Sequence, residues 1–577
     1  MTSPAATTLV ELRVLDGPNL YFPRPAIKLT VSVRRWIEAS EDRVASAASR
    51  IALPGAEERS GARLRPGLPG TEARRRFVAR LAAHVTRALA DAAGTSLGVR
   101  SRPGSQTDQV VVAFPWRRRG AAEALGQEVV SVLGVLLETR RSFGGLLQEA
   151  SRRMGRVEPG APPTLPEPTI PVIAVTGTNG KTTTVRILSH LGRTAGLTVA
   201  YSSTDGVYLN DRLVEEGDYS GFGGAGKALS QPDVQLAILE TARGGILLRG
   251  LGTLHNDVAV VTNVSADHLD LHGIRTLDQL AEVKATITKI TRLDGWDVLN
   301  ADDPRVLAMR RGIRGRPWVF SVDPDHPAVR SAVAERGRAT TVIDGRLTVV
   351  TPGMRPHPLL PMEDVPLTLA GISTQHTQNA MAAASAALGV HLPEEAVVEG
   401  LRTFVLDPQT NPGRANLFEL DGRVVVADYA HNEAGMAGLV EICRGLRRPG
   451  GEVWLAFCSA GDRTDQILHG IGYLAARGGD HVAIAELLHY LRGRDRQDLV
   501  DRLRAGAMDG GAKEVPVFID EVHAVEWMLD RSSPGDVVAV TALIQRPEIF
   551  TLMKERGAEK IGPGRVRELV REARGTV

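Results

Sequence analysis

The stretch PVIAVTGTNGKTTTVRIL, residues 171–188, decides the fold of this chain. Its first half is a β-branched apolar run, typical of a strand buried inside a parallel sheet, and its second half has the spacing of a helix. Between them lies a glycine-containing turn, Gly177 to Thr183, whose backbone N–H groups can surround phosphate oxygens at the start of the helix. Lys181 adds a positive charge near the phosphates, and the hydroxyl of Thr182 is a ligand for Mg²⁺.

The turn is a shortened form of the general phosphate-loop pattern G-x-x-x-x-G-K-[ST]. Val175 stands where that pattern has its first glycine, whereas Gly177, Gly180, Lys181 and Thr182 match the rest. A ligand-free glycine turn is the alternative. Because the strand, the turn, the Lys-Thr pair and the helix all agree, we predict a site for nucleotide phosphates.

Composition bounds the remaining possibilities. A chain of 577 residues predicts about three to four domains. The 69 basic and 67 acidic residues nearly cancel, which gives no support for a nucleic-acid or membrane partner. Two cysteines, Cys443 and Cys458, exclude a disulfide framework and a four-cysteine zinc site. The N-terminus has no basic segment followed by an apolar one, and no apolar run is long enough to span a membrane, so we expect a cytoplasmic protein.

Two proline-rich stretches divide the chain. GRVEPGAPPTLPEPTIP, residues 155–171, has the composition of an extended linker, and LDPQTNPGR, residues 406–414, is a candidate hinge. We predict an α/β protein with a small N-terminal α+β domain over 1–154, a linker over 155–170, a central ATP-binding domain over 171–405 and a doubly wound C-terminal domain over 411–577.

The strand-like runs support this division. They lie at 9–15 and 28–33; at 171–177, 197–203, 234–241, 258–264 and 296–303; and at 423–431, 452–459, 481–487, 515–520 and 537–543. An amphipathic helix is expected over 123–142. The arginine runs at 74–77 and 116–119 either hold an anion or are solvated surface, and the second interpretation is favoured.

Polar residues follow several predicted strands, where open α/β sheets bind their ligands. Glu240 follows one strand, the stretch from Ser265 to Asp270 with His268 follows another, and Asn300 to Asp303 follow a third. Each has a plain alternative: Glu240 as a helix cap, His268 as a loop histidine, and Asp302 and Asp303 as turn formers. Their joint placement favours a Mg²⁺–nucleotide cluster, with Glu240 and His268 as candidate metal ligands.

These motifs resemble the Mur ligase superfamily. The resemblance is carried by GTNGKT at 177–182, LETARGG at 239–245, NVSADHLDLHG at 263–273, LNADDP at 299–304, QNAMAAASAAL at 378–388, NPGR at 411–414 and DYAHN at 428–432. Within that group the chain is similar to the C-terminal half of cyanophycin synthetases, through LETARGGIL, GDRTDQ at 461–466 and LLHYLRGRD at 487–495; ELRVLDGPN at 11–19 resembles their N-terminus. Those enzymes carry an ATP-grasp domain where this chain has only the linker.

The resemblance implies an ADP-forming ligase that uses ATP and Mg²⁺ to join a small-molecule or peptide carboxylate to an amine or amino acid through an acyl phosphate, as a possible homo-oligomer. Lys181, His268 and Lys284 match catalytic positions, and Lys284 falls where many Mur ligases carry a carbamylated lysine. Thr182, Glu240 and His268 match metal ligands. The matching nucleotide-binding positions are Gly177, Thr178, Asn179, Gly180, Lys181, Thr182, Thr183, Asn300, Asn379, Arg414 and Asp428.

Two departures from the family pattern bear on function. His376 stands where the family usually has Asn on the adenine side, and Glu486 stands where a lysine is expected in the cyanophycin branch. A Mur-type scaffold that binds nucleotide or a partner without ligation is therefore the alternative function. A P-loop kinase or motor ATPase leaves DYAHN, residues 428–432, unexplained.

Overall fold

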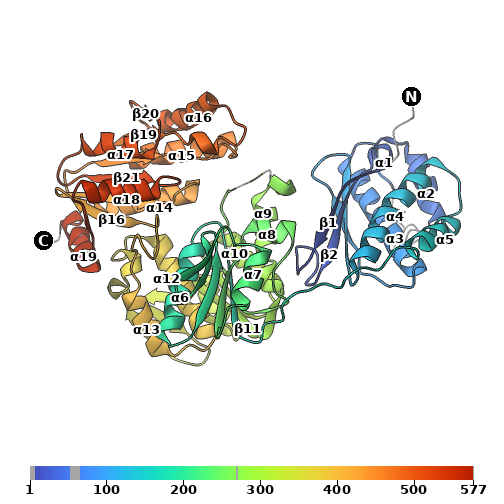
Figure 1. Ribbon diagram of the computed structural model, residues 1–577, viewed down its shortest axis with the longest axis horizontal. Coiled ribbons are helices and arrows are strands. Elements are labelled where there is room, and N and C mark those ends of the chain that lie inside the picture. Colours follow the sequence, from blue (N-terminus) through green and yellow to red (C-terminus); the bar gives the residue numbers. More distant parts are fainter. Residues whose placement is uncertain (1–6, 52–64, 268, 270, 576–577) are drawn as a thin grey trace.

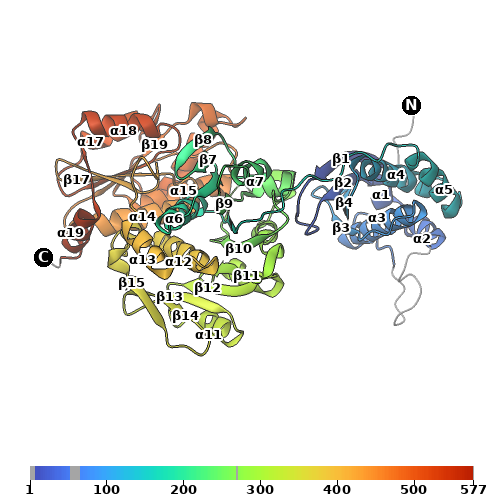
Figure 2. The same ribbon diagram turned by 60° about the horizontal axis from the view of Figure 1, so that its bottom comes forward.

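Three sheets, each with its own hydrophobic core, build the molecule. The computed structural model describes residues 7–51, 65–267, 269 and 271–575. The central unit touches both others, and the N-terminal unit stands at one end of the elongated molecule (Figures 1 and 2). Each sheet lies inside one predicted domain range, and the domain boundaries themselves stay predictions.

The N-terminal unit is an antiparallel sheet with helices on one face. Its strands, in the spatial order β1-β2-β4-β3, are β1 (Thr8–Leu15), β2 (Ala26–Ser32), β4 (Gln109–Pro115) and β3 (Arg100–Pro103). The helices are α1 (Arg34–Glu38), α2 (Glu41–Arg50), α3 (Glu72–Ala92), α4 (Arg119–Glu138) and α5 (Phe143–Met154). Among the described helices only α4 is long and apolar enough to cross a membrane. Its Val129 and Leu133 lie in the core of this unit, which accounts for that composition.

The central sheet has eleven strands, in the order β15-β14-β13-β12-β11-β10-β5-β9-β6-β7-β8. The seven from β13 to β6 are parallel, and antiparallel strands extend both edges. The strands are β5 (Val172–Thr176), β6 (Val199–Ser203), β7 (Gly206–Leu209), β8 (Arg212–Glu216), β9 (Leu236–Glu240), β10 (Asn256–Val261), β11 (Thr291–Asn300), β12 (Arg316–Ser321), β13 (Arg338–Ile343), β14 (Arg346–Val350) and β15 (His357–Pro361).

The direction of winding reverses at β5. The chain passes from β5 to β6 and β9 on one side and then to β10, β11 and β12 on the other. Such a reversal opens a crevice at the carboxyl end of the central strand, and the phosphate loop follows β5 directly. The topology therefore places the predicted nucleotide site where a parallel sheet binds ligands.

Helices cover both faces of this sheet. α6 (Lys181–Thr194), α12 (Thr374–Gly389) and α13 (Glu394–Thr403) pack on one face in a common core. The other face carries α7 (Phe222–Leu229), α8 (Arg243–Leu248) and α9 (Leu277–Lys284). α10 (Pro304–Ala308) and α11 (Pro327–Ala334) lie toward the β13 edge.

The C-terminal unit is a second wound sheet, in the order β20-β19-β18-β21-β17-β16-β22. Five strands are parallel, β17 (Arg423–Asp428), β18 (Val453–Phe457), β19 (His481–Ala485), β20 (Val517–Phe518) and β21 (Val537–Thr541); β16 (Asn416–Leu420) and β22 (Glu559–Lys560) are antiparallel additions. One face carries α14 (Glu433–Leu446), α15 (Asp465–Gly478), α16 (Arg496–Asp509) and α19 (Pro563–Ala573), and the other carries α17 (Glu521–Leu529) and α18 (Arg546–Glu555).

The bare face of the N-terminal sheet packs on the central unit. The backbone N–H of Gly17 donates to the carbonyl of Arg249 (3.1 Å), and that of Leu251 donates to the carbonyl of Pro18 (2.7 Å). An ion pair between Asp16 and Arg249 (2.7 Å) borders the contact. The DGPN segment of the N-terminal motif is thus one of the parts of the first unit that meet the central one, together with Arg13, which donates to the carbonyl of Leu247, and Arg102, which pairs with Glu282.

Candidate functional site

The phosphate loop is a tight turn between β5 and α6. Gly180 caps α6 in the left-handed conformation (φ 82°), and no side chain caps the first turn of the helix. A Cβ on Gly180 would lie 2.3 Å from Oδ1 of Asn379, and a Cβ on Gly177 would lie 1.8 Å from Oγ1 of Thr262. Both positions therefore require glycine. The N–H groups of the first turn have no side-chain acceptor, which is the arrangement that receives an anion.

The loop is held in shape by the segment after β10. Asn263 accepts from the N–H of Thr178 through its carbonyl (3.0 Å) and from the N–H of Asn179 through Oδ1 (2.9 Å). The hydroxyl of Thr262 donates to the carbonyl of Asn179 (2.6 Å). The sequence did not identify Asn263 and Thr262 as site residues, although their position directly after a central strand was an available signal.

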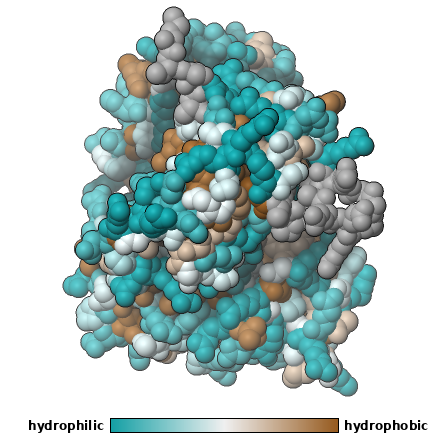
Figure 3. Space-filling view, turned by 90° about the vertical axis from the view of Figure 1, so that its right-hand side faces the viewer, coloured by the Kyte–Doolittle hydropathy of each residue, from teal (hydrophilic) through white to brown (hydrophobic). Residues whose placement is uncertain are grey.

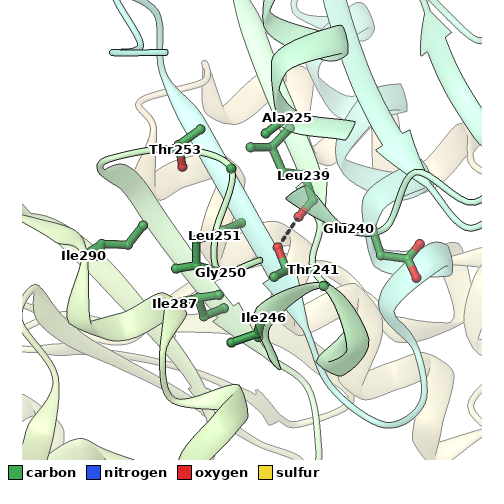
Figure 4. A pocket seen from close by; sticks show the side chains of 14 residues that line it. Ala225, Leu239, Glu240, Thr241, Ile246, Gly250, Leu251, Thr253, Ile287 and Ile290 are labelled. Atoms are coloured by element: carbon green, nitrogen blue, oxygen red, sulfur yellow. Dashed lines mark hydrogen bonds between the residues drawn. The ribbon is translucent and has the colours of Figure 1, made fainter. Parts of the chain in front are cut away.

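Glu240, at the carboxyl end of β9, and Thr182, in the first turn of α6, form an oxygen-rich pair. The Thr182 hydroxyl donates to Oε2 of Glu240 (2.9 Å), while Oε1 of the buried carboxylate has no hydrogen-bond partner among the described residues. Figure 4 shows the Glu240 side chain pointing away from the apolar residues Leu239 and Ile246 around it. Burial raises the pKa of Glu240, and the positive charges of Lys181 and Arg414 oppose that rise. An orphaned carboxylate oxygen beside a hydroxyl fits a hard cation such as Mg²⁺.

The helix-cap interpretation of Glu240 is wrong, because α8 begins after Ala242 and has no side-chain cap. His268, the other metal ligand expected from the sequence, lies outside the described residues. Within the described ranges, no three His, Cys, Asp or Glu side chains converge on one point. Glu240 and Thr182 therefore supply only part of a coordination sphere, which water and phosphate oxygens would complete.

Two lysines lie against the loop. Nζ of Lys181 donates to the carbonyl of Thr178 (2.9 Å), and Nζ of Lys284 donates to the carbonyl of Gly177 (2.6 Å). Lys284 is 3% exposed, so it is not a solvated helix lysine. Burial lowers the pKa of Lys284 well below its usual value, and the charge of Lys181 lowers it further. The buried site thus opposes the charged form of this amine.

The residues after β11 form hydrogen bonds that hold the segments around the site in place. Nδ2 of Asn300 donates to the carbonyl of Thr262 (2.8 Å), so its amide fixes the neighbouring strand end. Asp303 accepts from the N–H groups of Arg305 and Val306 and caps α10, as expected of a turn former. Asp302 accepts from Nε2 of Gln378 (2.8 Å) and thereby ties α12 to this edge.

A polar cavity lies between the phosphate loop and the C-terminal unit. Its lining includes Asn179, Gly180 and Thr183 of the loop, Gln375 and His376 of α12, Arg414 at the end of the 406–414 segment, and Asp428 and Tyr429 of the C-terminal unit. The guanidinium group of Arg414 lies over the Tyr429 ring (4.6 Å), and Asp428 accepts from the N–H of Ala415 (2.8 Å). The cavity thus joins residues more than 200 positions apart in the sequence.

His376 and Asn379 have buried polar atoms without partners. Nδ1 of His376 and Nδ2 of Asn379 form no hydrogen bond with the described residues. Burial lowers the pKa of His376 to about 4, with a further contribution from Arg414, so its imidazole is neutral at physiological pH. Because buried polar groups are normally satisfied, these atoms indicate a ligand or water in the cavity.

The central and C-terminal units contact each other beside the phosphate loop. The side-chain amides of Asn179 and Asn432 exchange two hydrogen bonds of 3.0 Å, and Asn432 also caps α14. Asp267 pairs with Arg463 (3.2 Å) and lies 3.7 Å from Nε2 of His431. The DYAHN and GDRT motifs of the C-terminal unit therefore face the strand ends of the central one.

Arg186 of α6 is a further site residue that the sequence did not reveal. Its guanidinium group is buried and donates to Oδ1 of Asn411 (2.9 Å) in the hinge segment and to Oδ2 of Asp205 (2.6 Å) after β6. The helix that begins at the phosphate loop is thus tied directly to the 406–414 segment, the candidate hinge. One arginine in a helical pattern carries no sequence signal for such a role.

Comparisons with known proteins agree with this geometry. Residues 175–387 match the family model of the Mur ligase middle domain, and residues 413–543 match that of the Mur ligase glutamate ligase domain. A cyanophycin synthetase of Crocosphaera subtropica is 37% identical over 64% of this chain and 42% of its own length. A UDP-N-acetylmuramyl-tripeptide synthetase of Deinococcus radiodurans is 28% identical over 65% of this chain and 73% of its own.

Among solved structures, a bifunctional folylpolyglutamate synthase/dihydrofolate synthase from Yersinia pestis, complexed with AMPPNP and Mn ion, is similar with a TM-score of 0.49 and 20% identity over 67% of this chain and 89% of that one. The chain spans less than half the length of the cyanophycin synthetases that it matches. The two family models together cover more than half of the chain, which therefore belongs to the Mur ligase superfamily.

Proposed function

We propose that this chain is an ATP-dependent, ADP-forming carbon–nitrogen ligase that joins a carboxylate to an amine through an acyl phosphate. The observation that carries the proposal is the meeting of three things at one point: an uncapped phosphate loop, the Glu240–Thr182 oxygen pair, and the Asn179–Asn432 contact with the C-terminal unit. A nucleotide on the loop would lie between two units, as a two-substrate ligation requires.

The residues of the loop would bind and orient the nucleotide. The N–H groups after Gly180 and the ammonium group of Lys181 would hold phosphate oxygens, and Thr182 and Glu240 would hold Mg²⁺. When bound, that ion neutralises charge on the transferred phosphoryl group. His376 and Asn379, with their unpartnered nitrogens, are the candidates for hydrogen bonds to the base.

The two units have separate tasks in this proposal. The carboxylate of one substrate takes the γ-phosphoryl group, and ADP leaves; the amine then attacks the acyl carbon, and phosphate leaves. An acyl phosphate hydrolyses if water reaches it, so contacts that close the junction protect the intermediate. The Asp267–Arg463 and Asn179–Asn432 contacts are placed for that task.

We propose the substrates only as chemical classes. The matched relatives include cyanophycin synthetases and peptidoglycan-precursor ligases, which supports an amino acid or other amine and a small-molecule or peptide acid. We propose a cytoplasmic location and no nucleic-acid or membrane partner, and a homo-oligomer is compatible with the proposal. Glu486 is paired with Arg496 (2.7 Å), so its charge is not free to select a basic amine.

The test is incubation of the full chain with Mg-ATP and pools of carboxylates and amines, followed by mass spectrometry of products. We expect ADP formation that depends on both pools, and its loss in Lys181→Ala. Lys513→Ala, an exposed lysine of the C-terminal unit, is the matched control. Nucleotide binding without product in any pool would favour the non-catalytic scaffold, and ADP formation that needs one acceptor alone would indicate a kinase.

A further inference from the structure

A large cavity lies in the N-terminal unit, apart from the strand-end site. Its volume is about 980 Å³. The walls come from the end of α3 and the turn after it (90–97), the end of β4 with Trp116, the first turns of α4, and the end of α5. Cavities of this size, part apolar and part polar, are typical of small-molecule sites.

The cavity carries one sign of charge. Arg24, Arg117 and Arg118 line it, together with three hydroxyl residues, and none of its lining residues is acidic. Within the described ranges, the side chains of these three arginines have no hydrogen bond, ion pair or ring contact. Two arginines close to them in the sequence or in space are paired, Arg119 with Glu123 and Arg153 with Glu128. All three side chains are exposed at the cavity, so their guanidinium groups are available to an anion that enters it.

The rest of the wall is apolar. Phe114, Trp116, Leu97 and Leu125 line the cavity, and the first two are almost fully buried in the unit. The outer end of the N-terminal unit, by contrast, is mostly hydrophilic, with hydrophobic patches interrupted by polar residues (Figure 3). The apolar surface in the cavity therefore suits the body of a small ligand, whose charged group would face the arginines.

We propose that this cavity binds a small molecule with a carboxylate, sulfonate or phosphate group on an apolar body, and that Arg117 and Arg118 hold the anionic group. The WRRR run at 116–119 then has a specific role in place of a solvated surface. The site is independent of the proposed ligase activity, because none of its lining residues belongs to the strand-end site.

The cavity also adjoins the start of the linker. Met154 and Gly155 are part of its wall, and the next residues are fixed on α4: the N–H of Arg119 donates to the carbonyl of Ala161, and that of Ala121 to the carbonyl of Pro159, both at 3.1 Å. A ligand in the cavity would contact the residues from which the linker leaves toward β5. Bound ligand should therefore slow hydrogen exchange at residues 156–161.

The experiment uses anilinonaphthalene sulfonate, a fluorescent anion with an aromatic body, and the full chain. We expect saturable binding of about one equivalent to the wild type, weakened by about tenfold or more in R117E/R118E, since two charge-assisted contacts are lost. The matched control R80E/R140E reverses two exposed arginines of the same unit that do not line the cavity, and should bind as the wild type does. Octanoate should displace the dye at lower concentration than 1-octanol or inorganic phosphate.

Several results would overturn the proposal. These are absence of saturable binding, equal weakening in both charge-reversal variants, or equal displacement by octanoate and 1-octanol. Thr95→Trp, at an exposed lining position, fills part of the cavity without altering its charge; it should change the affinity for the dye, and it tests the proposal if R117E/R118E fails to fold. Unchanged dye binding in a folded Thr95→Trp protein would place the dye elsewhere.

Discussion

Glu240 is a buried carboxylate that costs stability in the ligand-free protein. Its Oε1 has no hydrogen-bond partner in the part of the chain that the structure describes, and burial raises its pKa. A carboxyl group whose folded pKa lies above its unfolded one destabilises the fold at any pH above the unfolded pKa, and the cost reaches its full size above the folded pKa. We predict that Glu240→Gln stabilises the ligand-free protein at neutral pH and removes most of the stabilisation that Mg²⁺–ADP confers.

The two effects have different sizes. An unsatisfied buried polar atom costs about 1–3 kcal/mol. The amide oxygen of Gln can still accept from Thr182, but its NH₂ group has no acceptor on the side of Oε1, so we expect a net gain of about 1 kcal/mol. Ligand at a hundred times its Kd stabilises by about 2.7 kcal/mol, and a hundredfold loss of affinity reduces that to about 0.4 kcal/mol.

Scanning calorimetry with and without Mg²⁺–ADP measures both effects. Asp297→Asn is the control, because Asp297 is also a fully buried carboxylate of the central unit but accepts from Thr291 and Gly315, away from the loop. This control should keep the full ligand-induced shift in Tm. A Glu240→Gln protein that is less stable without ligand, or that keeps the wild-type shift, would refute the reasoning. The stability difference between the wild type and Glu240→Gln should also narrow as the pH falls and the wild-type carboxylate is protonated.

Three further predictions test the Arg186 contact with Asn411, the glycine of the phosphate loop, and a buried carboxylate away from the loop. Arg186→Met should lower the free energy of unfolding by about 2 kcal/mol, measured by urea titration, because the buried Oδ1 of Asn411 loses its donor and one charge-assisted bond is lost; an unchanged urea midpoint would argue against this role. Gly180→Ala should abolish Mg²⁺–ADP binding in calorimetric titration, since the new Cβ would lie 2.3 Å from Asn379 at φ 82°; normal binding would show that the loop adapts. Burial raises the pKa of Asp297 to about 7, so as the pH rises from about 4 to about 7 the wild type should lose stability relative to Asp297→Asn. Parallel profiles of Tm against pH for the two proteins would contradict this.

The sequence predicted the central features of the fold because they depend on local patterns. The apolar runs after Pro171 and before Glu240 are strands β5 and β9, and the Gly177–Lys181 turn lies between β5 and α6 as expected. The edge strands β7, β8, β14 and β15 were not predicted. They are short, partly exposed and joined by hairpins, so neither continuous apolarity nor a long alternating pattern marks them. The inner parallel strands β12 and β13 were not predicted either.

The candidate site was predictable where one motif carries both position and chemistry. Lys181, Thr182 and Glu240 gather as expected, since parallel strands end at the same edge of the sheet. Contacts between distant segments could not be predicted from the sequence. No local pattern pairs Asn179 with Asn432, or Arg186 with Asn411, which lies 225 positions away. Those pairs depend on how two separately folded sheets dock, which is decided by tertiary packing.

The energetics of the ligand-free site bear on the choice between a ligase and a non-catalytic scaffold. Glu240 and Lys284 are both buried, and burial opposes the charged form of each. A scaffold that only joined two units would be more stable with neutral side chains of similar size at these positions, because buried charges without full partners cost free energy. Such costs are offset when Mg²⁺ and phosphate supply the missing partners. The ligand-free protein therefore gives up stability at this site in favour of ligand binding. The change in stability caused by Glu240→Gln should have opposite signs with and without nucleotide, and it measures that exchange directly.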